Sequence, residues 1–181
     1  VNTCLKAILR AGVSRGDHVV VLGCGPIGLL LVQLAKLHGA RVSATDPIRE
    51  RVAIARELGA DADASGVRDA DVAIVAAASA SAIRAAFEAT RPAGRVLLFA
   101  QTQAGETTPV DVGQICVTEK DLMGSYSSDI ELNDRVAELI FSRRINVRAL
   151  ITHRFSLDHI SEAIAVASRP GPKSLKVVVQ P

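Results

Sequence analysis

The sequence predicts an α/β fold in which a doubly wound, six-stranded parallel sheet carries helices on both faces. Short apolar runs of strand length alternate with longer segments of helical length and periodicity along most of the chain. The first of these runs, His18–Leu22, is nearly all apolar, as expected of a strand buried on both faces. The alternation occurs in two halves, and right-handed crossovers then predict the strand order 3-2-1-4-5-6.

The first half reads as a lead-in helix followed by a complete βαβαβ unit. Apolar residues recur at helical spacing over residues 2–11, and Gly12 ends that helix. The leucine-rich segment after the first strand is too long for a strand, and Gly39 ends it as a helix. The elements predicted after the lead-in helix are strand His18–Leu22, helix Leu29–Leu37, strand Arg41–Thr45, helix Ile48–Leu58 and strand Asp61–Ser65.

The second half repeats this alternation and then adds a tail. The polar, turn-rich residues 101–109 predict a surface loop that folds over a ligand. A final strand-helix-strand segment exceeds the six-strand plan, so we expect it to pack outside the core sheet. The predicted elements are strand Asp71–Val75, helix Ala80–Ala89, strands Arg95–Ala100 and Leu122–Tyr126, helix Leu132–Ser142, strand Leu150–Phe155, helix Leu157–Ala167 and strand Leu175–Val179.

Composition excludes several classes of protein. A hydrophobic content of 49% in 181 residues suits a globular domain, and no apolar run approaches the roughly 20 residues of a membrane span. The 21 basic and 19 acidic residues are mixed along the chain without a basic stripe, which argues against a nucleic-acid partner. The dispersed cysteines Cys4, Cys24 and Cys116 form no disulfide framework, and with no signal peptide they favour a cytoplasmic location.

The strongest signal is the glycine-rich turn Gly23-Cys-Gly25-Pro-Ile-Gly28, which follows the first strand and opens a helix. Gly23 permits the tight turn, Gly25 lets the backbone approach a pyrophosphate, and Gly28 lets helix and strand pack closely. Pro26 suits the first helical turn, where its missing N–H costs little, and Ile27 follows it. Free N–H groups at such a helix start stabilise phosphate charge, so a Rossmann-type dinucleotide site is predicted.

Asp46 ends the second predicted strand, close to the roughly 20-residue spacing at which an acidic residue binds the adenosine ribose. A carboxylate there favours NAD, because it would repel the 2′-phosphate of NADP. Alternatively, Asp46 caps a helix that begins at Pro47, and one carboxylate can serve both roles. Arg49 and Arg51 either contact the adenosine or are solvated, and Arg49 is the residue that would accommodate NADP.

Several stretches together resemble the cofactor domain of medium-chain, zinc-dependent alcohol, sorbitol and threonine dehydrogenases. The resemblance covers nearly the whole chain. It is carried by Gly16-Asp17-His18, the glycine-rich turn, Asp46, Arg51, Leu58-Gly59-Ala60-Asp61, Arg91-Pro92-Ala93-Gly94-Arg95-Val96, Leu150-Ile151-Thr152-His153-Arg154-Phe155 and Ser174-Leu175-Lys176-Val177-Val178.

The resemblance implies further site residues. Arg51 would help to hold the adenosine ribose, and Lys176 would lie near the pyrophosphate. Ala77, Phe99 and Ala100 would line the adenine or nicotinamide cleft. This sequence departs from the family at Ala78 and Ala100, where glycine is frequent, which makes the nicotinamide side the less secure part of the site.

The resemblance also implies how the chain divides. Residues 1–15 would form the junction with a missing N-terminal catalytic domain, residues 16–148 the dinucleotide-binding domain, and residues 149–181 a return toward the catalytic domain. In the family that domain carries the catalytic zinc, and its cysteine and histidine clusters are absent from this chain. We therefore expect the chain to contain no catalytic or metal-binding residue and to be inactive alone.

Other polar residues favour plain structural roles. The histidines have no metal-ligand spacing, and Ser79 and Ser81 are expected to cap a helix. Tyr126 is followed four positions later by Ile130 instead of lysine, which argues against a short-chain dehydrogenase. Cys24 lies at the start of a helix, a position that lowers the pKa of a thiol and can make it reactive. Because no base is near it in the sequence, we favour the alternative that Cys24 is a small residue of the turn.

Three functions remain open at this level. The first is an NAD-dependent oxidoreductase that transfers hydride between NAD and an alcohol, polyol or carbonyl compound, with zinc in the missing half. The second is a non-catalytic nucleotide-sensing module of the same fold. The third is a zinc-free, NADP-dependent reductase of the quinone-reductase type, against which Asp46 argues. The apolar edge strand Leu122–Tyr126 predicts a homo-oligomer that pairs through it.

Overall fold

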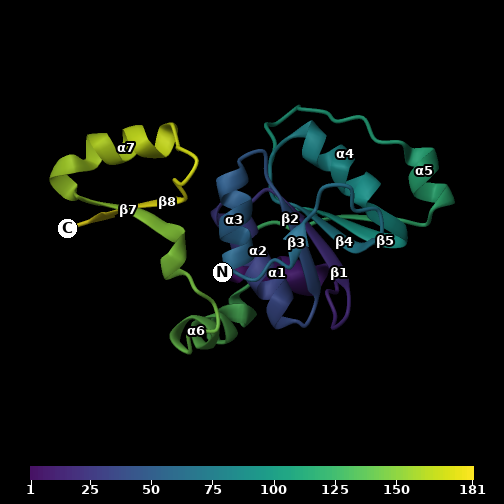
Figure 1. Ribbon diagram of the computed structural model, residues 1–181, viewed down its shortest axis with the longest axis horizontal. Helices are drawn as coiled ribbons and strands as arrows, with labels where there is room; N and C mark the ends of the chain where they lie inside the picture. Colours follow the sequence, from purple (N-terminus) through teal and green to yellow (C-terminus); the bar gives the residue numbers. More distant parts are fainter.

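The computed structural model describes residues 1–181 as a parallel sheet domain with a smaller unit beside it (Figure 1). The sheet has the order β3-β2-β1-β4-β5-β6, with every neighbouring pair parallel, which confirms the predicted doubly wound topology. Its strands are β1 His18–Leu22, β2 Arg41–Thr45, β3 Ala62–Asp63, β4 Ala70–Val75, β5 Thr90–Leu98 and β6 Asp121–Gly124.

The register brings the carboxyl ends of the central strands to one edge of the sheet. Leu22 at the end of β1 pairs with Thr45 of β2 on one side and with Val75 of β4 on the other. The end of β5 pairs in turn with Val75 and with the last residue of β6. Segments that follow these strands therefore meet at one edge, as they do in ligand-binding sheets of this kind.

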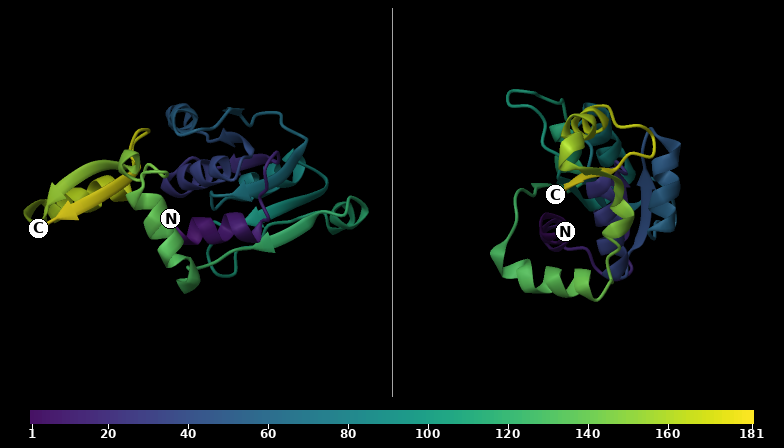
Figure 2. Two further views of the ribbon diagram at one scale, coloured as in Figure 1. Left: turned by 90° about the horizontal axis from the view of Figure 1, so that it is seen from below. Right: turned by 90° about the vertical axis from the view of Figure 1, so that its left-hand side faces the viewer.

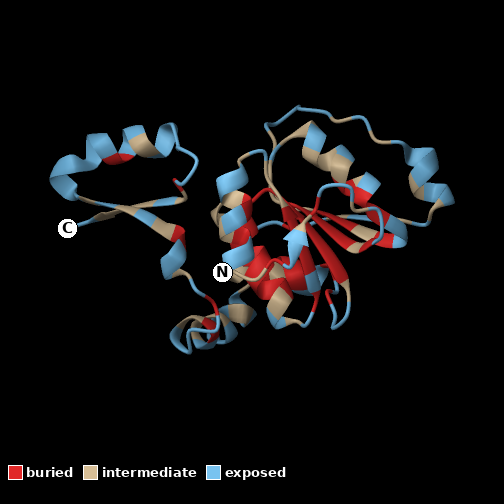
Figure 3. Cartoon of the chain, in the orientation of Figure 1, coloured by how far each residue is buried: buried red, intermediate tan, exposed pale blue.

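Each face of the sheet carries its own hydrophobic core, because successive side chains of a strand point to opposite faces. Val19 and Val21 belong to a core of 27 buried residues shared with α1, α2, α3 and α6. Val20 and Leu22 belong to a core of nine buried residues beneath α4. Figure 3 shows the buried strands between these layers. The helices are α1 Asn2–Arg10, α2 Pro26–Leu37, α3 Arg49–Glu57, α4 Ala80–Ala89 and α6 Asn133–Phe141.

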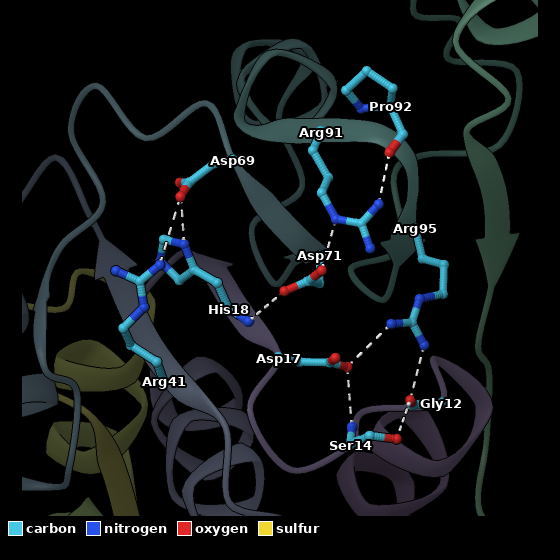
Figure 4. Close-up of polar contacts among 10 residues, drawn as sticks. All are labelled: Gly12, Ser14, Asp17, His18, Arg41, Asp69, Asp71, Arg91, Pro92 and Arg95. Atoms are coloured by element: carbon cyan, nitrogen blue, oxygen red, sulfur yellow. Dashed lines mark hydrogen bonds and ion pairs between the residues drawn. The ribbon is translucent and has the colours of Figure 1, made fainter.

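The opposite, amino edge of the sheet is tied together by charged groups (Figure 4). Asp71 accepts hydrogen bonds from the backbone N–H of His18 (2.7 Å) and from Nε of Arg91 (2.7 Å), which links β1, β4 and β5. Arg95 pairs with Asp17 (3.0 Å) and donates to a carbonyl oxygen just beyond α1 (2.7 Å). These contacts fix α1 against the sheet at the edge away from the glycine-rich turn.

The predicted strand-helix-strand tail forms a separate unit. Its strands β7, Ile151–Ser156, and β8, Lys176–Gln180, pair in parallel, and α7, Ile160–Ser168, packs against both. The three elements contact chiefly one another, and the left view of Figure 2 shows that the unit extends away from the sheet domain. Its exposed apolar side chains include Leu157 and Ile164. No helix of the chain is both long and apolar enough to traverse a membrane.

The structure differs from the prediction at several element boundaries. A short helix, α5 Val112–Val117, was not predicted; it has only six residues, none of them buried, which is too short to establish a helical period in the sequence. The sixth strand ends at Gly124, so that Tyr126 lies beyond it and is 75% exposed. The fifth strand begins at Thr90, five residues earlier than expected, because an irregularity in its pairing with β4 accommodates the Pro-Ala-Gly turn.

Candidate functional site

The glycine-rich turn lies at the carboxyl end of β1 and is shaped by close backbone contacts. Gly23 has φ 104°, in the left-handed region that favours glycine, and its N–H donates to the carbonyl of Thr45 (2.8 Å). A Cβ added to Gly23 would lie 3.0 Å from the Cβ of Ala77, in the segment that follows β4. The turn therefore packs between the ends of its two neighbouring strands.

The other two glycines have different surroundings. A Cβ at Gly28 would overlap the carbonyl oxygen of Gly23, so this position requires glycine for packing. A Cβ at Gly25 would meet no atom within 4 Å, so open space lies above the turn. Helix α2 begins at Pro26, and the N–H groups of Ile27 and Gly28 have no carbonyl partner inside it. Open space above free N–H groups is the arrangement that accommodates a phosphate.

Asp46 connects the end of β2 to this turn. Its Oδ2 accepts from the backbone N–H of Cys24 (2.8 Å), and its Oδ1 accepts from the N–H of Ile48 (2.8 Å). Helix α3 begins at Arg49 with Ile48 as its N-cap and no side-chain cap, so the alternative that Asp46 caps a helix starting at Pro47 is wrong. Each carboxylate oxygen keeps a further lone pair, which leaves acceptors for ligand hydroxyls.

A cavity of about 510 Å³ opens beside Asp46. Arg49 and Arg56 contribute positive charge to its wall, and Asp63 and Ser65 line the far side. Hydrogen bonds from Ser65, whose N–H lies 2.7 Å from Oδ1, hold the pKa of Asp63 below its usual value. The cavity therefore presents both carboxylates and guanidinium groups to a ligand that reaches beyond the end of β2.

A second cavity, of about 330 Å³, lies between the sheet domain and the β7–α7–β8 unit. Arg51 and Lys176 both line it, with Pro26 and Ser174. Nη2 of Arg51 donates to the carbonyl of Ser174 (3.3 Å), whereas Nε of Arg51 and Oγ of Ser174 are buried without partners. A buried polar group without a hydrogen-bond partner destabilises the fold, so a ligand that supplies acceptors for Nε of Arg51 and Oγ of Ser174 would be favoured. Phosphate oxygens are such acceptors, and the positive charges of Arg51 and Lys176 would also attract them.

The remaining predicted residues follow β4 and β5 at the same edge. The N–H groups of Phe99 and Ala100 both donate to the carbonyl of Val75, at 3.1 and 3.0 Å, and Ala77 lies beside Gly23. Ser125 lies at the same edge but was not predicted: its buried Oγ has no partner, and its N–H donates to the carbonyl of Leu98 at the end of β5. The sequence feature that could have identified Ser125 is its position: it is a polar residue directly after the sixth strand, at the edge of the sheet where the other site residues lie.

Two other predictions concern reactive groups. Burial, together with the negative charges of Asp46 and Asp63, raises the pKa of the Cys24 thiol to about 12, which supports its role as a small turn residue. Ser79 caps α4 as predicted, because its Oγ accepts from the N–H of Ala82 (3.2 Å). Ser81 lies inside that helix and hydrogen-bonds to Ser79 instead of capping it.

The side chains of this chain do not fit a zinc ion. No three His, Cys, Asp or Glu residues converge in an arrangement that would hold a metal. The same chain does fit a dinucleotide, with open space above the glycine turn, an acidic residue at the end of β2 and unpartnered donors near Lys176. These features define the class: a dinucleotide-binding domain of Rossmann type.

Comparison with known proteins identifies the family. A family model described as zinc-binding dehydrogenase matches residues 26–142, which is more than half of the chain. The chain belongs to the zinc-binding dehydrogenase family. The matched region begins in the glycine-rich turn and ends after α6, so it covers most of the sheet domain.

Curated relatives share the whole of this chain but extend well beyond it. A zinc-type alcohol dehydrogenase-like protein of Escherichia coli K12 is 30% identical over 99% of the chain and 54% of its own length. Sorbitol dehydrogenase of Bombyx mori is 31% identical over 97% of the chain and 55% of its own length. The chain thus spans about half the length of the curated relatives that it matches.

Solved structures share the fold of the entire chain. A zinc-binding dehydrogenase from Sinorhizobium meliloti 1021, bound to NADP, matches with a TM-score of 0.91 and 28% identity over 99% of this chain and 57% of its own. An alcohol dehydrogenase from Escherichia coli CFT073, complexed with NADH, matches with a TM-score of 0.88 and 26% identity over 99% of this chain and 56% of its own.

Proposed function

We propose that this chain is the NAD-binding half of a zinc-dependent alcohol or polyol dehydrogenase. The observation that carries the proposal is Asp46, a carboxylate at the end of β2 whose oxygens are hydrogen-bonded to the glycine-rich turn and to the start of α3. A carboxylate there favours the free ribose hydroxyls of NAD over the 2′-phosphate of NADP. The relatives named as sorbitol and alcohol dehydrogenases support a small alcohol, polyol or carbonyl substrate.

Each predicted residue has a defined part in this proposal. The backbone from Gly23 to Gly28, with Pro26 and Ile27 at the helix start, binds the diphosphate, and Lys176 adds a positive charge to it. Asp46 and Arg51 bind the adenosine ribose. Ala77, Phe99 and Ala100 line the cleft along the ends of β4 and β5. When bound, the nicotinamide supplies the acceptor or donor of the hydride.

The division of the chain follows the same proposal. Residues 16–148 bind the dinucleotide, and residues 1–15 and 149–181 contact a catalytic half that carries the zinc and the substrate site. This chain supplies binding groups and no Lewis acid, so we expect the isolated chain to bind dinucleotide and to oxidise no alcohol. Alcohol-dependent NADH formation by the isolated chain would contradict this part of the proposal.

A titration of NAD and NADP against the chain and two Asp46 variants tests the cofactor assignment. We expect Asp46→Ala to weaken NAD binding by about 10- to 150-fold, since a hydrogen bond to a charged group is worth roughly 1.5–3 kcal/mol. NADP binding should weaken much less, because the same change removes a repulsion. Asp46→Asn keeps one acceptor oxygen for the turn and separates loss of charge from loss of turn geometry.

Asp61→Asn is the matched control. Asp61 also joins two segments through hydrogen bonds, from the N–H of Val42 (2.7 Å) and from Lys36 (2.9 Å), but at the amino edge of the sheet. It should leave the NAD affinity unchanged. Unaltered NAD affinity in both Asp46 variants would mean that Asp46 only holds the turn. A wild-type preference for NADP would show that Arg49 and Arg56 outweigh the carboxylate and would overturn the NAD assignment.

A further inference from the structure

A cavity of about 550 Å³ is lined by residues of α4 and α5 and belongs to a different edge of the sheet. Two of its wall residues lie within two positions of the start of a strand: Arg68 precedes β4 and Lys120 precedes β6. The dinucleotide residues, in contrast, follow strands at the carboxyl edge. The cavity is therefore remote from the glycine-rich turn, and nothing in the proposed function uses it.

The wall of this cavity combines an apolar surface with unpaired positive charge. Its apolar part comes from Phe87 on α4, Ile115 on α5 and the preceding residues Pro109 and Val110. Its charged residues are three cations, Arg68, Arg84 and Lys120, and two carboxylates, Glu88 and Asp111, which leaves one positive charge in excess (three minus two).

The two carboxylates are already engaged, whereas two of the cations are not. Glu88 pairs with Arg68 (3.5 Å), and Asp111 accepts from the N–H of Gln114 (2.9 Å) to cap α5. Lys120 donates only to the backbone carbonyl of Phe87 (2.7 Å), and neither Lys120 nor Arg84 has a carboxylate within 4.0 Å. Burial lowers the pKa of Lys120, as expected of a cation that lacks a counter-ion.

We propose that this cavity binds a small aromatic monocarboxylate, with the carboxylate at Lys120 and Arg84 and the ring against Phe87 and Ile115. Lys120 has three N–H donors and uses one, so a ligand carboxylate can accept the others. A single excess positive charge matches a monoanion, whereas Glu88 and Asp111 repel a polyphosphate. A volume of about 550 Å³ suits a ligand of one or two fused rings.

Calorimetric titration of the chain with 2-naphthoate tests this proposal. Wild type should bind one equivalent, and saturating NAD should not displace it. Lys120→Met removes the charge at similar length and should weaken binding at least about tenfold, because a charge-assisted hydrogen bond is lost. Lys6→Met is the matched control, since Lys6 also donates to a backbone carbonyl, that of Tyr126 (3.2 Å), elsewhere in the molecule. It should bind 2-naphthoate like wild type.

A second variant keeps the test decisive where Lys120→Met fails to fold. Gln114→Glu adds a negative charge to the exposed rim without touching Phe87 or Lys120, and it should weaken 2-naphthoate binding severalfold. Absence of wild-type binding would overturn the proposal. Wild-type affinity for 2-naphthoate in the folded Lys120→Met and Gln114→Glu variants would also overturn it. Displacement of 2-naphthoate by NAD would do the same, because it would place the probe at the dinucleotide site.

Discussion

At the scale of single residues, the glycines of the turn have different structural roles. Gly28 is required because a side chain there would overlap the carbonyl of Gly23. Gly25 has φ −71°, which any residue can adopt, and open space above it. The fold therefore needs Gly28 for packing, whereas it tolerates a side chain at Gly25, where only a ligand would meet it.

This contrast predicts opposite effects of two alanine substitutions. Gly28→Ala should lower the free energy of unfolding by about 1–3 kcal/mol, the usual cost of overpacking. Gly25→Ala should leave it within about 0.5 kcal/mol of wild type, yet weaken dinucleotide binding because its methyl group occupies the phosphate space. Denaturant unfolding and calorimetric titration measure the two quantities. Equal destabilisation by both substitutions would contradict the assigned packing roles.

The roles of these glycines were predictable, but those of their neighbours were only partly so. The spacing of Gly23, Gly25 and Gly28 after an apolar strand predicts the turn from local sequence alone. The hydrogen bond from Cys24 to Asp46 depends on β1 and β2 lying side by side, which no local pattern encodes. A site role for Ser125 or Ser174 was not predicted for the same reason: the burial of their hydroxyl groups depends on segments far away in the sequence.

At the scale of secondary-structure elements, prediction succeeded where burial imposes a pattern. The strands β1 and β4 are buried on both faces and read as apolar runs, and α2 reads as a leucine-rich helix. The six-residue helix α5 buries none of its residues and was not predicted, whereas strand β3 was predicted but is shorter than the expected Asp61–Ser65. Short elements at the surface were therefore either missed or predicted with the wrong length.

The amino-edge contacts predict how stability depends on pH. Burial acts to raise the pKa of Asp71, but the N–H of His18 and the guanidinium of Arg91 outweigh it, so the folded pKa lies below the usual value. A lowered folded pKa stabilises the fold above the unfolded pKa of about 3.9, and this contribution disappears as pH falls through the folded pKa. Wild type should therefore lose stability steadily below about pH 4.

Asp71→Asn removes this titration, and Arg91→Met returns the pKa of Asp71 toward its usual value. Both variants should be less stable than wild type at neutral pH and should show a smaller loss of stability below about pH 4. Denaturant unfolding at several pH values measures how steeply the free energy of unfolding falls with pH. If both variants lost stability below about pH 4 as steeply as wild type, other carboxyl groups would be responsible for the destabilisation by acid.

At the scale of the whole molecule, the sheet domain and the β7–α7–β8 unit join through few side chains. Leu150 and Leu175 pack against the main core, and Arg51 reaches Ser174. The sequence predicted that this tail would lie outside the sheet, because six strands complete the doubly wound plan. It did not predict that β7 and β8 would pair with each other, since pairing partners of two isolated strands depend on tertiary contacts.

The edge position of β6 leads to a prediction about assembly. Strand β6 has a neighbour on one side only, and Leu122 on it is 44% exposed. An unpaired apolar edge favours pairing with a second copy, so we expect a homodimer through β6. Leu122→Arg should shift the sedimentation profile toward monomer, whereas Ile164→Arg on α7 should not. A chain that stays monomeric at every concentration would contradict the predicted interface.

The contact between Arg51 and Ser174 also has a consequence for biosynthesis. The two residues are separated by 123 positions, so the ribosome must add that length before the wall of the cavity that both residues line is complete. At about 5–20 residues per second, this interval lasts roughly 6–25 s. The glycine-rich turn and Asp46 emerge long before Lys176, and the nascent chain therefore passes through a stage in which the turn is present without that lysine. Tight dinucleotide binding is then a property that the chain acquires only after Lys176 has been added.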